Sequence, residues 1–165
     1  MAVMTSAAAA RAALAEAVRA DKSVVALGED LGRGGVFAQY KGLADVFGAA
    51  RIIDTPISES AIMGVGVGMA LAGLRPVVEL RYCDFAVCAA DEVVNQAAKA
   101  RFMLGGQARV PVVVRQPIGI WWSSAAQHSQ SLEAWYAHVP GLVVVAPATP
   151  GDAYGLLRAA IANDD

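Results

Sequence analysis

The sequence has little charge, few aromatic residues and only two cysteines. Charged residues make up 17% of its 165 residues and the formal net charge is −2, so no excess of positive charge favours nucleic acid or an acidic membrane surface as a partner. Two cysteines, Cys83 and Cys88, provide no disulfide framework and suit a reduced compartment. We expect both to be small core residues, because a metal site would need further ligands at a suitable spacing.

No apolar run in the sequence is long enough to cross a membrane. The longest, Ala61–Leu74, is shorter than the roughly 20 residues that a spanning helix needs. Charged side chains interrupt the alanine-rich start, which predicts an amphipathic helix capped by Thr5 or Ser6 and no targeting segment. With 56% apolar residues, the chain fits one domain over residues 1–165, which we expect to be cytoplasmic.

Short apolar runs alternate with helical patterns along the chain. Strands are predicted at residues 23–30, 51–54, 75–80, 110–116 and 141–147, and the last two are continuous β-branched runs of the kind buried on both faces. A long helix is predicted from Asp84, as its N-cap, to Leu104, and a final helix from Thr149 as N-cap with Pro150 at its first position. The alternation predicts an α/β fold with a mainly parallel sheet and helices on both faces.

Polar residues follow several of the predicted strands. Glu29, Glu59, Asp84 and His128 each come after a different strand. The carboxyl ends of parallel strands share one edge, where ligands bind in such sheets. The sequence therefore predicts a single cleft at that edge.

A stripe of small residues follows Glu59. Gly64, Gly68 and Ala72 recur at every fourth position, so on a helix they form one smooth face. Such a face packs either onto the chain's own sheet or against another subunit, and both possibilities remain open at this point. Glu59 itself is either an acid favoured by the helix dipole or a carboxylate that shares a proton with a ligand nitrogen.

Several long motifs occur together in a family pattern. They are "LGED", "RIIDTPISE", "GMALAGLRPVVE", "DEVVNQAAKARFMLGGQARVPVVVR" and "AAQHSQSLEAWYAHVPGLVVVAP". With them the chain resembles the beta subunit of the thiamine-diphosphate-dependent decarboxylating component of pyruvate, branched-chain 2-oxo acid and acetoin dehydrogenase complexes. The resemblance implies a pyrimidine-binding domain and a cofactor that lies between two subunits. It also implies that an alpha subunit holds the diphosphate and Mg²⁺ through a Gly-Asp-Gly motif, which this chain lacks.

The resemblance assigns roles to five residues. It implies that Glu59 hydrogen-bonds the 1′ nitrogen of the aminopyrimidine and so helps to activate the cofactor. Ile57 and Phe85 match apolar and aromatic contacts to the same ring, and Arg81 lies near it where Met or Gln is usual. His128 matches a histidine that orients the substrate and stabilises charge during reductive acylation of the lipoyl group.

The family pattern implies further sites and partners. Glu29 and Asp91 match acids of a polar passage between two cofactor sites of a tetramer. The partners implied are the alpha subunit, a second beta subunit and the lipoyl acyltransferase, and the family's C-terminal domain is absent from these residues. A structural monovalent cation such as K⁺ is expected at four matching positions, Val112, Ala160, Asn163 and Asp165.

The sequence also suggests a substrate and leaves two alternative functions open. Adjacent Trp121 and Trp122 beside His128 predict a small acyl pocket and hence pyruvate as the substrate. The alternatives are a non-catalytic oligomerisation module and the middle domain of a transketolase-like enzyme.

Overall fold

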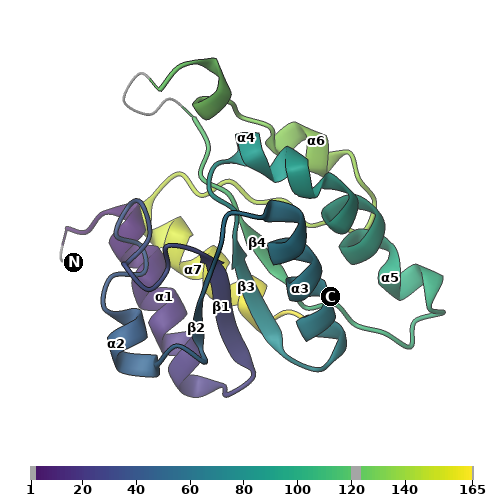
Figure 1. Cartoon of the computed structure of the whole chain (residues 1–165), viewed down its shortest axis with the longest axis horizontal. Helices are drawn as coiled ribbons and strands as arrows, with labels where there is room; N and C mark the ends of the chain where they lie inside the picture. The colour runs from purple at the N-terminus through teal and green to yellow at the C-terminus, as the bar shows by residue number, and fades with distance from the viewer. Residues whose placement is uncertain (1–2, 120–123, 165) are drawn as a thin grey trace.

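A computed structural model describes residues 3–119 and 124–164. Its four strands are all parallel and form one sheet in the order β2-β1-β3-β4, with bounds β1 (Val24–Glu29), β2 (Ile52–Thr55), β3 (Arg75–Glu79) and β4 (Val113–Arg115). Gly28 of β1 pairs with Asp54 of β2 and with Glu79 of β3, so these strands end level with one another. Their carboxyl ends share one edge of the sheet (Figure 1).

Helices cover both faces of the sheet, which confirms the predicted α/β fold (Figure 1). On one side α1 packs against α7, and α3 lies on the other side with the helical segment that follows β3. The helices have the bounds α1 (Ser6–Ala20), α2 (Leu43–Phe47), α3 (Glu59–Leu71), α4 (Cys83–Ala86), α5 (Ala98–Met103), α6 (Glu133–Ala137) and α7 (Pro150–Ala162). In the part of the chain that the structure describes, no helix combines the length and the apolar character needed to cross a membrane.

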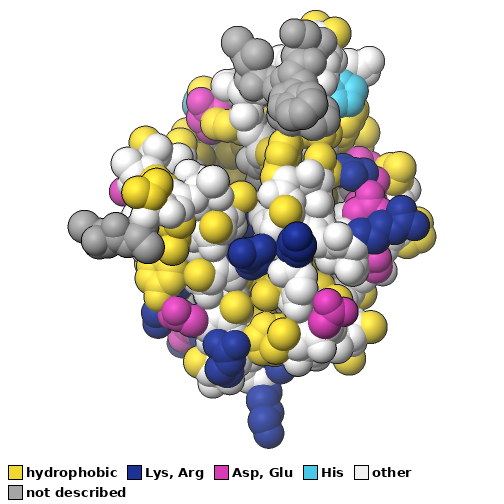
Figure 2. Space-filling model, turned by 90° about the vertical axis from the view of Figure 1, so that its left-hand side faces the viewer, with side chains coloured by type: hydrophobic (Ala, Val, Ile, Leu, Met, Phe, Trp, Pro, Cys, Tyr) yellow, Lys and Arg dark blue, Asp and Glu magenta, His cyan; other side chains and the backbone are white. Residues whose placement is uncertain are grey.

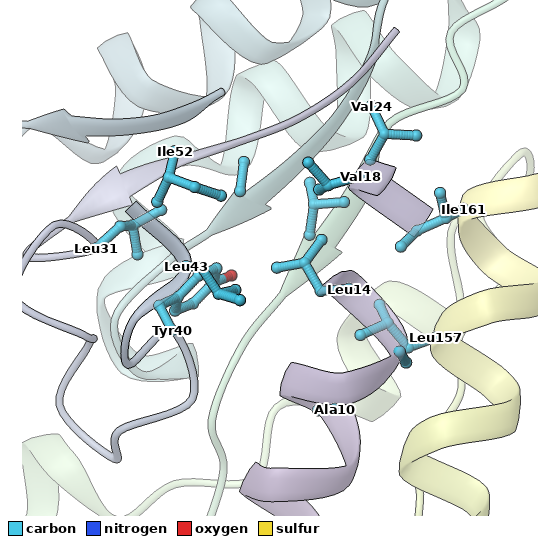
Figure 3. Close-up of a cluster of buried hydrophobic side chains, with 13 residues drawn as sticks. Ala10, Leu14, Val18, Val24, Leu31, Tyr40, Leu43, Ile52, Leu157 and Ile161 are labelled. Atoms are coloured by element: carbon cyan, nitrogen blue, oxygen red, sulfur yellow. The ribbon is translucent and has the colours of Figure 1, made fainter. Parts of the chain in front are cut away.

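Two apolar clusters, one on each face, hold the layers together. In the first, Leu14 and Val18 of α1 meet Leu157 and Ile161 of α7 beneath the sheet (Figure 3). The ring of Tyr40 lies in the same cluster and is fully buried. This cluster therefore joins the start of the chain, its end and the loop that follows β1.

Caps begin the first and last helices where the sequence predicts them. The Thr5 hydroxyl accepts a hydrogen bond from the backbone N–H of Ala8 and starts α1. Thr149 and Asp152 form a reciprocal capping box at the start of α7, with Pro150 as the first helical residue.

The strand predicted at residues 141–147 is absent, so that prediction was wrong. No described residue pairs with this segment, and Val143 and Val145 are 84% and 50% exposed. Strand propensity reflects how a residue fits a pleated surface, and it produces a strand only where a neighbour takes up the backbone N–H and C=O groups. β4 is an edge strand of the described sheet, and no described strand pairs with its outer edge.

The predicted helix from Asp84 to Leu104 exists, but it is neither regular nor capped by Asp84. It begins at Cys83, and a π-helical turn, Glu92–Ala97, divides it. Tyr82 is the N-cap residue and makes no side-chain cap. The Asp84 carboxylate instead accepts hydrogen bonds from Gln130, because a distant loop lies within reach that the sequence pattern does not show.

The small residues of α3 divide between its two faces. Gly66 packs onto the sheet, where an added Cβ would lie 2.5 Å from Cγ2 of Val78. Gly64, Gly68 and Ala72 are exposed, so packing onto the chain's own sheet is wrong for this stripe. A subunit interface stays the prediction for it.

Candidate functional site

A pocket of about 420 Å³ lies at the carboxyl edge of the sheet. Its walls come from the end of β1, the start of α3, the segment after β3 and the loop after β4. Every pyrimidine-contact and catalytic candidate lies in this wall. The lining residues are Glu29, Ile57, Glu59, Arg81, Tyr82, Phe85, Ser124 and His128. The structure thus gathers residues that are up to 99 positions apart, from Glu29 to His128, in one place.

Glu59 is the carboxylate in this pocket that is left available for a ligand. It is the first residue of α3 and is half-buried, beside the 71% exposed side chain of Ile57. Among the described residues it has neither a hydrogen-bond partner nor an ion-pair partner. A half-buried carboxylate without a partner at the start of a helix can accept a hydrogen bond from a ligand.

Arg81 pairs with two other acids at this edge. Its guanidinium forms ion pairs with Glu29, through Nη1, and with Asp30, through Nη2 at 2.9 Å. The side chain of Glu29 is only 13% exposed, so this pair is screened less than a surface pair. Arg81 therefore neutralises part of the negative charge of the pocket.

Aromatic rings form the wall beside His128. The imidazole meets the rings of Phe85 and Tyr82 edge-on, with centroids 5.0 and 5.4 Å away. Nδ1 of His128 is buried and has no hydrogen-bond partner among the described residues. Tyr82 also contacts Phe37, and burial raises the pKa of its hydroxyl.

Sequence reasoning missed Tyr82. Its backbone has φ 66°, which is uncommon for a bulky residue and turns the chain from β3 into α4. A tyrosine between a strand and a Cys-Asp-Phe run is the only sequence signal for this position.

Comparison with models of known families shows the family to which the chain belongs. The model of the family described as "Transketolase, pyrimidine binding domain" matches residues 2–165. The chain belongs to this family. This pyrimidine-binding domain is 49% identical over 162 residues to the pyruvate dehydrogenase E1 component subunit beta of Rhizobium meliloti, which covers 98% of this chain and 35% of that protein.

Other relatives have related names. The domain is 45% identical to the 2-oxoisovalerate dehydrogenase subunit beta of Bacillus subtilis, over 100% of this chain and 51% of that protein. It is 49% identical to the 3-methyl-2-oxobutanoate dehydrogenase subunit beta of Mycobacterium tuberculosis, over 93% of this chain and 44% of that protein. The chain thus spans about half or less of the length of these relatives. A solved structure titled "Split gene transketolase, inactive beta4 tetramer" shares the fold, with a TM-score of 0.73 at 19% identity over 99% of this chain and 49% of that one.

A buried charge network lies beside the pocket and was also missed. Glu79, at the end of β3 and 4% exposed, accepts hydrogen bonds from Tyr40 Oη at 2.8 Å and Gln39 Nε2 at 3.2 Å. Nη1 of Arg115, at the end of β4, lies 3.2 Å from the same carboxylate. Burial and the charge of Glu79 raise the pKa of Tyr40. In this domain the network fastens the glycine-rich loop after β1 to the sheet.

Asp91 lies away from the pocket. It is exposed on the helical segment after α4, and its carboxylate accepts hydrogen bonds from Asn95 Nδ2 at 2.7 Å and Gln96 Nε2 at 3.2 Å. Of the two acids expected in a polar passage, only Glu29 lines the pocket of this chain. The passage itself stays a prediction.

The expected cation positions lie at the amino-terminal edge of the sheet and the end of α7. There the guanidinium of Arg75 donates to the backbone oxygens of Ile161 and Asn163, at 3.0 and 2.8 Å. This arginine already supplies positive charge to carbonyls at the end of α7. Val112 and Ala160 are half-buried, while Asp165, like Trp121 and Trp122, lies outside the described residues, so the cation site stays a prediction.

The cysteines have different environments. Cys83 is buried, as predicted, and burial raises its pKa, whereas Cys88 is exposed and its predicted core position was wrong. Cys88 lies on the outer side of the short 3-10 turn that follows α4. The described residues contain no cluster of three or more side chains that could hold a metal ion.

Proposed function

We propose that this chain forms the pyrimidine half of a thiamine diphosphate site in the beta subunit of a 2-oxo acid dehydrogenase. The observation that carries the proposal is the pocket itself, which brings together Ile57, Glu59, Arg81, Phe85 and His128. Relatives at 45–49% identity are named as beta subunits of pyruvate and branched-chain 2-oxo acid dehydrogenases, which supports this class of reaction.

The residues present fit an aminopyrimidine ring. Phe85 and Ile57 offer apolar surface to a flat ring, and Glu59 offers a carboxylate with no other described partner. Glu59 would share a proton with a ring nitrogen, and Phe85 and Ile57 would set the plane of the ring. When bound, thiamine diphosphate would supply the carbon nucleophile that attacks the 2-oxo group and retains the electron pair left by CO₂.

His128 and Arg81 complete the assignment on this chain. His128 lines the same pocket as Glu59, beside two aromatic rings, and would donate a hydrogen bond to a substrate oxygen that gains negative charge. Arg81 would hold Glu29 and Asp30 as ion pairs, so that these acids do not compete with Glu59 for the cofactor nitrogen.

The other half of the site would come from partners. An alpha subunit with a Gly-Asp-Gly motif would hold the diphosphate and Mg²⁺, since this chain has no such motif. A second beta subunit would pack on the exposed Gly64/Gly68 face, and a lipoyl acyltransferase would receive the acyl group. We propose pyruvate as the preferred 2-oxo acid, although the pyruvate and 3-methyl-2-oxobutanoate relatives share the same 49% identity with this chain.

Reconstitution tests the proposal. The isolated chain is expected to be inactive, and activity with pyruvate should appear when the full-length subunit is combined with its alpha partner, thiamine diphosphate and Mg²⁺. Glu59→Gln should lower the rate by about 10²–10⁴, the usual range for loss of general acid–base catalysis. Asp45→Asn, on the exposed surface of α2 and outside the pocket, is the matched control.

Different outcomes separate the alternatives. Full activity of Glu59→Gln would remove the proton-sharing role of this residue. Cofactor-independent tetramers with no decarboxylation would favour an oligomerisation module, and turnover of sugar phosphates in place of 2-oxo acids would favour a transketolase-like enzyme. A preference for 3-methyl-2-oxobutanoate over pyruvate would contradict the substrate proposal alone.

A further inference from the structure

Four consecutive residues, Tyr82–Phe85, form a seat for the loop that carries His128. The outer two, Tyr82 and Phe85, contact the imidazole ring edge-on. The inner two, Cys83 and Asp84, contact Gln130, which lies two residues beyond His128. This one short segment thus contacts both the imidazole ring of His128 and the backbone of Gln130, two residues further along the loop. We call Tyr82–Phe85 the His128 seat.

Gln130 binds to Cys83 and Asp84 of the seat and also to Gly119, which lies before His128 in the chain. Its side-chain Nε2 and backbone N donate to Oδ1 of Asp84 at 2.8 and 3.3 Å. Its backbone oxygen accepts from Sγ of Cys83 at 3.1 Å and from the backbone N of Gly119 at 3.0 Å. Although burial opposes the shift, the hydrogen bonds from Gln130 lower the pKa of Asp84. Asp84 is therefore a charged acceptor, which makes its bond to Gln130 stronger than a neutral one.

The two ring nitrogens of His128 lie in different environments. Nδ1 is buried without a partner among the described residues, while the ring still lines the pocket. A buried N–H with no acceptor is rarer and less favourable than a buried lone pair, since the proton loses its water hydrogen bond and gains nothing. The neutral imidazole therefore carries its proton on Nε2 as long as the seat keeps Nδ1 buried.

We propose that Asp84 and Gln130 are positioning residues that fix His128 in the Nε2–H tautomer and direct that N–H to the pocket. The catalytic meaning of this arrangement rests on the proposed function, because a donor at Nε2 is what a developing oxyanion needs. The arrangement itself concerns this chain alone and is measurable without cofactor or alpha subunit. A failure of decarboxylation would therefore leave it unaffected.

Long-range ¹H–¹⁵N NMR of the histidine rings tests the proposal on the whole 165-residue chain. The chain has only two histidines, so His138, outside the pocket, is an internal control in every spectrum. At a pH where both rings are neutral, we expect His128 of the wild type to show the large separation between its two nitrogen shifts that marks a single Nε2–H tautomer. Asp84→Asn should keep this pattern, because the amide oxygen still accepts from Gln130.

Two variants should lose the pattern. In Asp84→Ala and in Gln130→Ala, the two nitrogen shifts of His128 should move toward one another as the ring samples both tautomers, while His138 stays unchanged. If Asp84→Ala fails to fold, which loss of the His138 pattern would show, Gln130→Ala decides, since it removes only the side-chain bond. An unchanged His128 in a folded Gln130→Ala variant, or an Nδ1–H tautomer in the wild type, would overturn the proposal.

Discussion

Replacing Tyr40 with phenylalanine removes one hydroxyl from a buried ion pair and leaves the packed ring in place. That hydroxyl donates to Glu79 at 2.8 Å and accepts from Nη1 of Arg115 at 3.1 Å. Tyr40 is fully buried and Glu79 is 4% exposed, so no water of the bulk solvent replaces the lost partner. Glu79 would stay buried and Arg115, with 20% of its side chain exposed, would stay half-buried, and each would lose one hydrogen-bond partner.

The expected cost is close to that of a single hydrogen bond to a charged group, because Glu79 and Arg115 still pair with each other after the hydroxyl is lost. A hydrogen bond to a charged group contributes about 1.5–3 kcal/mol, so Tyr40→Phe should lower the free energy of unfolding by roughly 2 kcal/mol. For a domain of this size that corresponds to a fall in Tm of about 4–8 °C. Urea unfolding and thermal unfolding both measure the loss, and the dependence of the free energy on urea should keep its slope.

A second triad in the same chain supplies the control. Tyr154 donates to Glu16 at 2.6 Å and accepts from Arg158 at 2.8 Å, which are the same roles at shorter distances. Its partners are exposed, with 45% of the Glu16 side chain and 51% of the Arg158 side chain open to solvent. Tyr154→Phe should therefore change the free energy of unfolding by no more than about 0.5 kcal/mol.

Comparing Tyr40→Phe with Tyr154→Phe distinguishes the effect of burial from the effect of hydrogen-bond distance. If hydrogen-bond distance set the contribution, Tyr154→Phe would cost at least as much as Tyr40→Phe. Equal losses in the two variants, or a larger one at Tyr154, would refute the reasoning that desolvation decides the strength of these networks.

The remaining predictions concern helices α3 and α7. Gly66→Ala should destabilise the chain by about 1–3 kcal/mol, because the added Cβ would lie 2.5 Å from Cγ2 of Val78. Gly68 has open space around it, so Gly68→Ala should stabilise the chain by about 0.5–1 kcal/mol. Urea unfolding measures both changes. At the start of α7, Thr149→Ala should cost about 1 kcal/mol. Hydrogen bonds from Thr149 lower the pKa of Asp152. The carboxylate therefore contributes fully to the stability of the fold above its unfolded pKa of about 4, and this contribution is lost as pH falls through the lower folded pKa. Asp152→Asn should flatten the pH dependence of Tm in this acid range.

The sequence predicts most of the fold because local patterns specify most of it. Continuous apolar runs gave β1, β3 and β4, and threonine caps placed the starts of α1 and α7 within a residue. The pattern failed at residues 141–147, where the same β-branched composition has no strand beside it. It failed again at Asp84, whose preference for helix starts is outweighed by a hydrogen bond to Gln130, 46 positions away.

The residues of the candidate site could be predicted from the sequence where a motif of the family contains them. Glu59, Phe85 and His128 were nominated by the family resemblance, and the structure places them in one pocket. Glu79 and Tyr82 could not be found in that way, since nothing local distinguishes a buried strand-end acid from an exposed one. Their roles depend on which side chains the loop after β1 and the loop after β4 bring near them, and that is a property of the tertiary structure.

Three glutamates at one edge of the sheet have the same chemistry and different availability. Glu29 is paired with Arg81, and Glu79 is paired with Arg115 in a buried network. Glu59 alone of the three has no partner among the described residues; it lines the pocket together with Glu29, whereas Glu79 is buried at the end of β3. Of these three glutamates, only Glu59 has no arginine partner among the described residues. In the proposed function, Arg81 and Arg115 engage Glu29 and Glu79, and Glu59 is the glutamate left to accept a hydrogen bond from a ligand nitrogen.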